Sequence, residues 1–471
     1  MAGQFQPGED KVLSGVYSFL KSFIKEQTTI GNRGKLALPI VADWGPIGEF
    51  VTVRSKISAE KIFGITEAFN LIWAADPFPT EVLLYRVAGD SAATASVVLK
   101  NGETDVLRVE AKYKGEAGNK LKVVVQPSLL DANQTELLVY RGFELVDSRT
   151  GKTVDELVAA FADSEFVVLK KLTDTLPAST AGVSLSGGNS GTSVEATKYT
   201  TYQSALATQK GKYGVFTLGI ADPALNAAAE DWTKQQNVLG NYIKFVFGGD
   251  EARDKSKQAT TKASTDVNHM AVVNVGSGAR WKGKTYPSSK VAIYVAAIMA
   301  SLPLNYTMAL YITPFESLTV EWDPDTDLTD MVQAGVLMLN MDNDKVIIQE
   351  PVNTLTIPGP DQSREFGKIR VADTFHTILH AEEKAGKDWI RQQPNSNSPA
   401  RRAAFCQMMK QEVFRPLAAL EVIAADYEYI EDPDYHGDNA IYTPARNAGH
   451  FIAGFRHQDA LEKIYIYNQA K

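Results

Sequence analysis

Near the end of the chain, two charged residues are followed directly by an apolar run. Residues 461–467 read Leu-Glu-Lys-Ile-Tyr-Ile-Tyr, and from Ile464 onward both faces of an extended chain would be apolar. β-Branched and aromatic side chains fit the pleated surface of a sheet, so this stretch predicts a strand. Because a lone strand cannot pair its own N–H and C=O groups, it must join a sheet in its own subunit or in a neighbouring one.

A second apolar cluster stands within residues 1–32, which are otherwise polar and interrupted by glycine and proline. It comprises Val16, Tyr17, Phe19, Leu20, Phe23 and Ile24. We interpret residues 1–32 as an N-terminal arm that carries one strand at about 15–24. The alternative is a frayed end without a role, since chain ends are often poorly ordered. A functionless end, however, has little need of so many large apolar residues.

Alternating helices and strands on both sides of a central insertion predict an α/β body. In its first part, residues 33–94, strands at 35–41 and 80–87 flank a helix capped by Ser58 and a helix at 66–75. In its second part, residues 190–352, we expect helices at 197–208, 223–240, 288–300 and 328–339, and strands at 214–218, 243–247, 270–275 and 346–349. Such alternation implies right-handed crossovers and a largely parallel sheet that is covered on both faces.

Short strands with Gly and Asn turns occupy the insertion at residues 95–185. They are expected at 95–99, 106–111, 121–127, 136–140, 143–147 and 166–170, with one helix at 154–162. Regular strand spacing of this kind is typical of a β-sandwich. The residues at 184–191, rich in Ser and Gly, predict a flexible linker behind it.

The rest of the chain predicts a C-terminal α+β domain at residues 353–457 and a C-terminal arm at 458–471. Amphipathic periodicity indicates a long helix at 365–390 and a second helix at 399–417. Strands at 421–429 and 448–456 follow them. The strand at 461–467 then belongs to the arm.

Composition narrows the class of protein. The chain has 471 residues, 44% hydrophobic and 22% charged, which is typical of a globular protein with several domains. A net charge of −8 disfavours nucleic acid as the main partner, because phosphate binding rests on basic clusters. Cys406 is the only cysteine, so no disulfide can form within the chain, and we expect folding in a reducing compartment. We find neither a signal-peptide pattern nor an apolar run that could span a bilayer.

Candidate chemistry is sparse. His376 and His380 have the spacing of metal ligands on a helix, but no glutamate stands between them, and a partly solvated helix face explains them better. Residues 323–327 imitate a calcium loop, yet Leu328 and Ala334 occupy the places of its glycine and its bidentate glutamate. The chain has no phosphate loop with a lysine and no Gly-x-Ser-x-Gly elbow. We therefore expect no enzymatic activity, no cofactor and no metal.

Several stretches, taken in their order along the chain, resemble tail sheath proteins of contractile-tailed bacteriophages. They are residues 35–46, which end in Asp-Trp-Gly-Pro, the helix–strand body, residues 351–356 and the closing residues 459–466. The resemblance implies a subtilisin-like α/β domain that is a scaffold without proteolysis. It also implies a subunit of the virion tail, assembled in the host cytoplasm, where a helical sheath surrounds an inner tube and shortens to drive that tube through a cell envelope.

The resemblance further implies the partners. These would be other copies of the chain, the inner tube protein, and the baseplate and tail terminator proteins, without nucleic acid and without membrane insertion. The sheath of a phage-tail-like bacteriocin or injection particle is the alternative setting. A static shell or adhesin protein is a further alternative, and an α/β hydrolase is a remote one.

In that family the two arms leave their subunit and add strands to the C-terminal sheet of a neighbour. The donor residues implied here are Val16, Tyr17, Phe19, Leu461, Ile464, Tyr465, Ile466 and Tyr467. The acceptor residues would be Val422, Ile423, Tyr427, Phe451, Ile452 and Phe455. We also expect the start of the long helix to face the tube through Arg364, Lys368 and Arg370, although an ordinary solvated face explains these cations equally well.

Rough free energies indicate when such arms become ordered. Complete burial of residues 464–467 would contribute on the order of 6–12 kcal/mol, whereas fixing about seven backbone residues costs roughly 7–14 kcal/mol. Since the two nearly cancel, we expect arms that order on binding a neighbour, and assembly that needs a template such as the tube or the baseplate. Contraction would then be a switch between two packings of rigid bodies.

Overall fold

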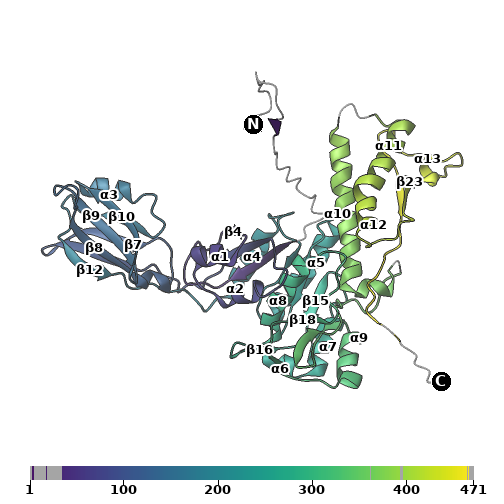
Figure 1. Ribbon diagram of the computed structural model, residues 1–471, viewed down its shortest axis with the longest axis horizontal. Coiled ribbons are helices and arrows are strands. Elements are labelled where there is room, and N and C mark those ends of the chain that lie inside the picture. Colours follow the sequence, from purple (N-terminus) through teal and green to yellow (C-terminus); the bar gives the residue numbers. More distant parts are fainter. Residues whose placement is uncertain are drawn as a thin grey trace.

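The computed structural model describes residues 3–4, 17–18, 34–360, 362–392, 396–463 and 465. A β-sandwich lies at one end of the molecule, an α/β body in the middle and a C-terminal domain with one long helix at the other end (Figure 1). Near the N-terminus, β1 (Gly3–Gln4) pairs in parallel with β2 (Tyr17–Ser18). The rest of the strand predicted at 15–24 lies outside the described residues.

A seven-stranded sheet forms the centre of the α/β body, in the order β20-β15-β14-β13-β3-β5-β4. All neighbouring strands run parallel except β4, which is antiparallel to β5. The strands are β3 (Lys35–Ile40), β4 (Phe50–Val53), β5 (Glu81–Arg86), β13 (Val215–Phe216), β14 (Lys244–Phe247), β15 (Val272–Val275) and β20 (Val336–Leu337). The largely parallel sheet is therefore confirmed, and β4 and β20 are strands that the pattern missed.

Alternate residues of the central strands point into two separate cores. Leu36 and Leu38 of β3 lie in one core and Ala37 lies in the other. Helices α1 (Lys56–Phe63), α2 (Glu67–Ile72) and α8 (Ser288–Ser301) cover the first face, and α4 (Ala196–Leu206), α5 (Pro223–Val238) and α7 (Lys257–Thr265) cover the second. The short helix α6 (Glu251–Asp254) precedes α7. The cap of α1 is Ser55 rather than Ser58, because the Ser55 Oγ accepts a hydrogen bond from the Ser58 N–H at 3.2 Å.

Two small antiparallel sheets complete the body. One has the order β17-β16-β19 and the other β18-β22-β21. Their strands are β16 (Ala279–Trp281), β17 (Lys284–Tyr286), β18 (Tyr311–Ile312), β19 (Ser317–Leu318), β21 (Leu339–Asp342) and β22 (Lys345–Ile348). The strand predicted at 346–349 therefore belongs to an antiparallel sheet and not to the parallel one.

The helix predicted at 328–339 is wrong beyond its first turns. A π-helical turn, Pro324–Leu328, leads into α9 (Thr329–Gln333). Gly335 then has a φ of +78°, a backbone conformation that glycine adopts readily and that ends a helix. The following residues extend into β20 at the edge of the central sheet.

The predicted β-sandwich is confirmed. One sheet has the order β10-β9-β8-β12 and the other β11-β7-β6, with a common apolar core between them. The elements are β6 (Ser96–Asn101), β7 (Thr104–Ala111), a 3-10 turn at Glu116–Lys120, β8 (Leu121–Pro127), β9 (Thr135–Arg141), β10 (Glu144–Gly151), α3 (Val154–Ala160), β11 (Val167–Lys171) and β12 (Thr180–Ser184). Strand β12 was not expected from the sequence, because Gly182 interrupts its apolar pattern.

The segment that leaves the sandwich pairs with the segment that enters it. Ala93 and Asn189 exchange backbone hydrogen bonds of 2.9 and 3.0 Å, and Ser96 and Ser186 exchange bonds of 2.8 and 3.1 Å. The prediction of a flexible linker at 184–191 is therefore wrong. Paired chains resist bending better than a single Gly/Ser chain, which behaves as a random coil.

A buried arginine connects the body to the sandwich at the junction between them, which we call the Arg86 joint. The side chain of Arg86, at the end of β5, is fully buried, and its Nη1 donates to the carbonyl of Gly45 at 2.7 Å and to that of Lys114 at 2.8 Å. Gly45 belongs to a turn of the body and Lys114 to the sandwich. Burial lowers the pKa of Arg86 to about 10, which leaves the guanidinium charged at neutral pH.

In its described residues, the C-terminal domain combines four α-helices, one of them very short, with a two-stranded sheet. Its elements are a 3-10 turn at Arg364–Gly367, α10 (Ile369–Arg391), α11 (Pro399–Met409), a π-helical turn at Lys410–Phe414, α12 (Arg415–Ala419), β23 (Glu428–Glu431), the short α13 (Pro433–His436) and β24 (Phe451–Gly454). Figure 1 shows α10 as the longest helix, standing between the body and the other helices of this domain. The predicted long helix is thus confirmed, starting at Ile369 instead of residue 365.

Candidate functional site

The sheet of the C-terminal domain has two strands among the described residues. β23 and β24 pair in antiparallel register, with Tyr429 opposite Ala453 and Ile430 opposite Ile452. Among the described residues no further strand pairs with either of them. Two-stranded sheets are marginally stable alone, so this one depends on the helices beneath it, where Tyr429 of β23 lies against Phe405 of α11 with ring centroids 6.0 Å apart.

The outer face of this sheet exposes an apolar pair. Ile430 is 39% exposed and Ile452, directly across the ladder, is 41% exposed. An exposed strand with free N–H and C=O groups is a template for pairing with another chain. The outer edges of β23 and β24 therefore offer a place where an extended segment can add a strand.

The structure separates the predicted acceptor residues into two groups. The strands predicted at 421–429 and 448–456 are shorter than expected, and Val422 and Ile423 are not part of β23. Both side chains are buried in the core of the domain, so neither offers a side-chain contact to another chain, and their role as strand acceptors through the backbone stays a prediction. Tyr427, Phe451 and Phe455 are half-buried against the same core, and only Ile452 is exposed.

The predicted donor residues are described only in part. Leu461 is 82% exposed and Tyr465 is 90% exposed, which leaves both side chains available to a partner. Tyr17 lies in the short strand β2. Outside the described residues are Val16, Phe19, Ile464, Ile466 and Tyr467.

Polar side chains hold the start of the C-terminal arm, residues 458–463, which we call the arm root, against the domain. We call this group of side chains the clasp: Lys368, Arg370, Thr307, Asp459 and Glu462. The Lys368 Nζ lies 2.5 Å from the Asp459 Oδ2 and 3.1 Å from the Glu462 Oε2. The Arg370 Nη1 lies 3.3 Å from the Asp459 Oδ1, and the Thr307 hydroxyl donates to Glu462 at 2.6 Å.

Electrostatics favour the charged form of the clasp. Burial alone would raise the pKa of Asp459, but hydrogen bonds from Lys368 and from the Ala460 N–H outweigh it and hold the pKa below its usual value. The arm therefore leaves the domain from a fixed point. Sequence reasoning missed this role of Asp459 and Glu462, although two acids directly before an apolar run were a usable signal.

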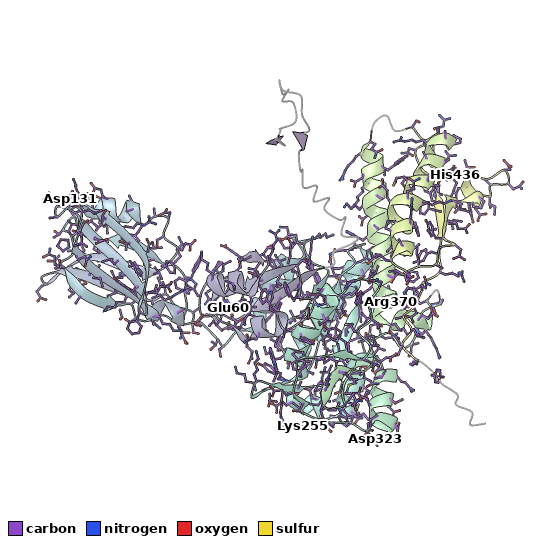
Figure 2. The ribbon with its side chains drawn as sticks, viewed as in Figure 1. Glu60, Asp131, Lys255, Asp323, Arg370 and His436 are labelled. Atoms are coloured by element: carbon purple, nitrogen blue, oxygen red, sulfur yellow. The ribbon has the colours of Figure 1, made fainter. Side chains whose placement is uncertain are left out.

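The clasp also corrects the predicted tube-facing residues. Arg370 is buried and paired inside the chain, and Figure 2 shows it where the C-terminal segment leaves the domain. Lys368 is occupied by the arm root. Arg370 and Lys368 are therefore no longer expected to face the tube. Arg364 is exposed, and its tube-facing role stays a prediction.

The two histidines of α10 lie on its packed side. His376 is buried, its ring stacks on Tyr242 of the body with centroids 5.2 Å apart, and neither ring nitrogen has a hydrogen-bond partner among the described residues. Burial, with a contribution from Lys244, lowers its pKa to about 3. Burial also lowers the pKa of His380. No cluster of metal-binding side chains is found in the described part of the chain.

The polar groups that could suggest a hydrolase are structural. The Ser288 hydroxyl, at the start of α8, donates to Asp254 at 2.5 Å and accepts the Gly249 N–H at 2.7 Å. Ser288 is fully buried, so the pair fixes the helix start and does not face solvent. Asp323 caps a turn by accepting the Asp325 N–H at 2.9 Å. None of the described helices is long and apolar enough to cross a bilayer.

Comparisons with known proteins add an independent view. Residues 88–192 match the phage tail sheath protein β-sandwich domain. The phage-like element PBSX protein XkdK of Bacillus subtilis is 24% identical over 412 residues, which cover 81% of this chain and 82% of that protein.

Solved structures share the fold. A sheath tail protein of Listeria innocua superposes with a TM-score of 0.70 and 20% identity, covering 92% of this chain and 97% of that one. The helical sheath of the anti-feeding prophage in its contracted state gives a TM-score of 0.53 and 10% identity, covering 97% of this chain and 100% of that one. The resemblance to tail sheath proteins and the mixed α/β class with a β-sandwich are thereby confirmed, whereas the subtilisin-like detail stays a prediction.

Proposed function

We propose that this chain, which has the β-sandwich domain and the fold of phage tail sheath proteins, is the structural subunit of a contractile sheath that polymerises helically by exchanging terminal strands. The observation that carries the proposal is the unfinished sheet β23–β24, with its exposed Ile430 and Ile452. The exposed Leu461 and Tyr465 of the arm are the complementary feature.

Strand addition suits such an assembly physically. An arm that pairs along a sheet edge gains main-chain hydrogen bonds without a large flat interface. Because donor and acceptor are different surfaces of the subunit, the contact is head-to-tail, and a head-to-tail contact that does not close on itself generates a helix. The clasp gives every subunit the same point of departure for its arm.

The shape of the molecule suits a sheath that shortens. The sandwich lies far from the C-terminal domain (Figure 1), and the Arg86 joint holds it to the body. We propose that the subunits move as rigid bodies while the arms keep them connected, and that new contacts between outer domains favour the contracted packing. The inner tube and the baseplate would be the partners, and no catalytic step is required. The particle would be a phage tail or a related injection particle.

Truncation of the arm tests this proposal. A chain that ends at Lys463 keeps the clasp residues and loses the apolar run that follows them. With an inner tube or a baseplate present as the template, we expect the full chain to form helical tubes or rings in negative-stain electron microscopy and the truncated chain to remain monomeric with unchanged thermal stability. Tubes from the truncated chain would contradict strand exchange. Tubes with one lattice and no shortened form would instead favour a static shell.

A further inference from the structure

A cleft of about 360 Å³ lies beside β24, between the second half of α10 and the start of α11. Its walls include the rings of Trp389, Phe405 and Phe451, and its rim carries Arg401 and Arg446. The ring centroids of Phe405 and Phe451 lie 4.8 Å apart, so the floor of the cleft belongs to the same core that supports the β23–β24 sheet. We call this feature the α10 groove.

A glycine keeps the α10 groove open. Gly386 lies inside α10, where glycine weakens a helix relative to alanine because it loses more backbone freedom on folding. A Cβ atom at this position would meet no described atom within 4 Å. Packing within the subunit therefore does not demand a glycine here. The space above it is consistent with a contact made by another chain.

The chemistry of the α10 groove fits an aromatic ring with a polar tip. The Arg401 guanidinium lies 4.0 Å from the centroid of the Trp389 ring. Its Nε is buried and has no hydrogen-bond partner among the described residues. An incoming tyrosine ring can stack on the free side of the guanidinium and bring its hydroxyl within reach of an arginine donor. The C-terminal arm carries such residues at Tyr465 and Tyr467.

The length of the arm decides whether a chain can fill its own α10 groove. Glu462 is held at Lys368, the residue that precedes α10, by an ion pair of 3.1 Å. Along α10, residues 368 to 386 span about 27 Å at about 1.5 Å per residue. Residues 462 to 465 span at most about 11 Å when fully extended. Even residues 462 to 467 span at most about 18 Å, so the backbone at neither Tyr465 nor Tyr467 of one chain reaches its own groove.

We infer that the α10 groove is the socket for a tyrosine of the C-terminal arm of a second copy, seated above Gly386 and against Arg401 while the arm backbone adds to the β23–β24 sheet. The inference rests on the proposed strand exchange and deepens it, because it assigns a side-chain site to an interaction that main-chain pairing alone leaves without a fixed register. The socket would set the register of the donated strand.

Cysteine pairing between two singly substituted chains tests the inference. The only native cysteine, Cys406, is buried, so engineered thiols report without interference. Chains with Gly386→Cys are mixed with chains carrying Tyr465→Cys or Tyr467→Cys under assembly conditions and oxidised. Since each chain has one engineered thiol, a disulfide between engineered positions joins two copies. We expect about tenfold more disulfide-linked dimer than with Lys384→Cys, which lies on α10 outside the groove.

A third acceptor separates this inference from the proposed function. Ile452→Cys lies on the β23–β24 sheet itself. If the arm links to Ile452→Cys and no better to Gly386→Cys than to Lys384→Cys, strand exchange stands and the socket is overturned. If the arm links to none of them, both fail.

Filling the groove gives a second test. Gly386→Trp is expected to raise the concentration needed for assembly about tenfold, whereas Gly386→Ala is expected to assemble like the wild type and to melt at a higher temperature. Equal assembly by Gly386→Trp and Gly386→Ala, with both folded by circular dichroism, would overturn the socket.

Discussion

At the scale of single residues, buried polar side chains hold the domains together. His376 is the clearest case, because α10 presents it to Tyr242 of the body beside the Lys244–Asp373 ion pair. Burial and the nearby Lys244 charge lower its pKa to about 3, while the unfolded chain takes up a proton near its ordinary value of 6.5. Between pH 3 and pH 6.5 the native state therefore binds fewer protons than the unfolded state. Stability is full above pH 6.5 and is lost as the pH falls from there through 3.

We predict that His376→Phe removes much of this acid sensitivity, because phenylalanine keeps the stacked ring and takes up no proton. Between pH 7 and pH 5 the wild type should lose about 2 kcal/mol more unfolding free energy than the variant. Urea unfolding at both pH values measures the difference. Tyr242→Phe, which leaves the histidine in place, should keep the wild-type loss. An equal loss in His376→Phe would show that other groups carry the acid response.

A second prediction concerns Arg86. Arg86→Met leaves the buried carbonyls of Gly45 and Lys114 without their donor, which we expect to cost about 2 kcal/mol of unfolding free energy. Hydrogen exchange should also become faster around Lys114, since the joint loosens. The control is Arg54→Met, which breaks an exposed ion pair with Glu81 and should cost less than about 1 kcal/mol. Unchanged exchange at the joint would argue against a locking role.

At the scale of elements, hydrophobic periodicity predicted the helices and strands correctly wherever a stretch was long and repeated its pattern. The strands of the sandwich other than β12, and the helices α5, α8 and α10, follow their predicted positions within a few residues. The edge strand β20 was missed because it has two residues and follows directly on Gly335. A pattern of residue types cannot show that a short apolar stretch has changed from helix to strand.

The candidate site was harder to predict for a related reason. An apolar residue next to a strand can face its own core or a neighbour, and the sequence pattern is the same in both cases. Val422 and Ile423 serve their own core, whereas Ile452 is exposed. Likewise, periodicity placed Arg370 on a helix but could not reveal that its partner is Asp459, far along the chain.

The clasp yields a prediction at this scale. Lys368→Met removes the cation shared by Asp459 and Glu462, so the arm root should lose its fixed direction. We expect amide exchange in residues 458–463 to rise about tenfold, which corresponds to about 1.4 kcal/mol of lost local stability. The matched control is Lys387→Met, which removes an exposed pair with Glu383 on the same helix. Equal exchange in both variants would mean that the ion pairs do not hold the root.

At the scale of the whole molecule, several buried and paired contacts hold the domains of the chain to one another. The paired connection and Arg86 fix the sandwich, buried contacts fix α10 to the body, and the clasp fixes the arm root. Among the described residues β23 and β24 have no further strand partner, and the proposed function assigns that place to another copy. Under that proposal, the sheath works by polymerisation and by two alternative packings of the same bodies.

The central claim is that the C-terminal arm pairs with a different copy of the chain. A cryo-electron microscopy reconstruction of the assembled polymer, with each chain traced without a break from its C-terminal domain to residue 467, tests it most directly. We predict that residues 461–467 add a strand to the β23–β24 sheet of a neighbouring subunit. A trace in which those residues pair only with strands of their own chain would contradict the account.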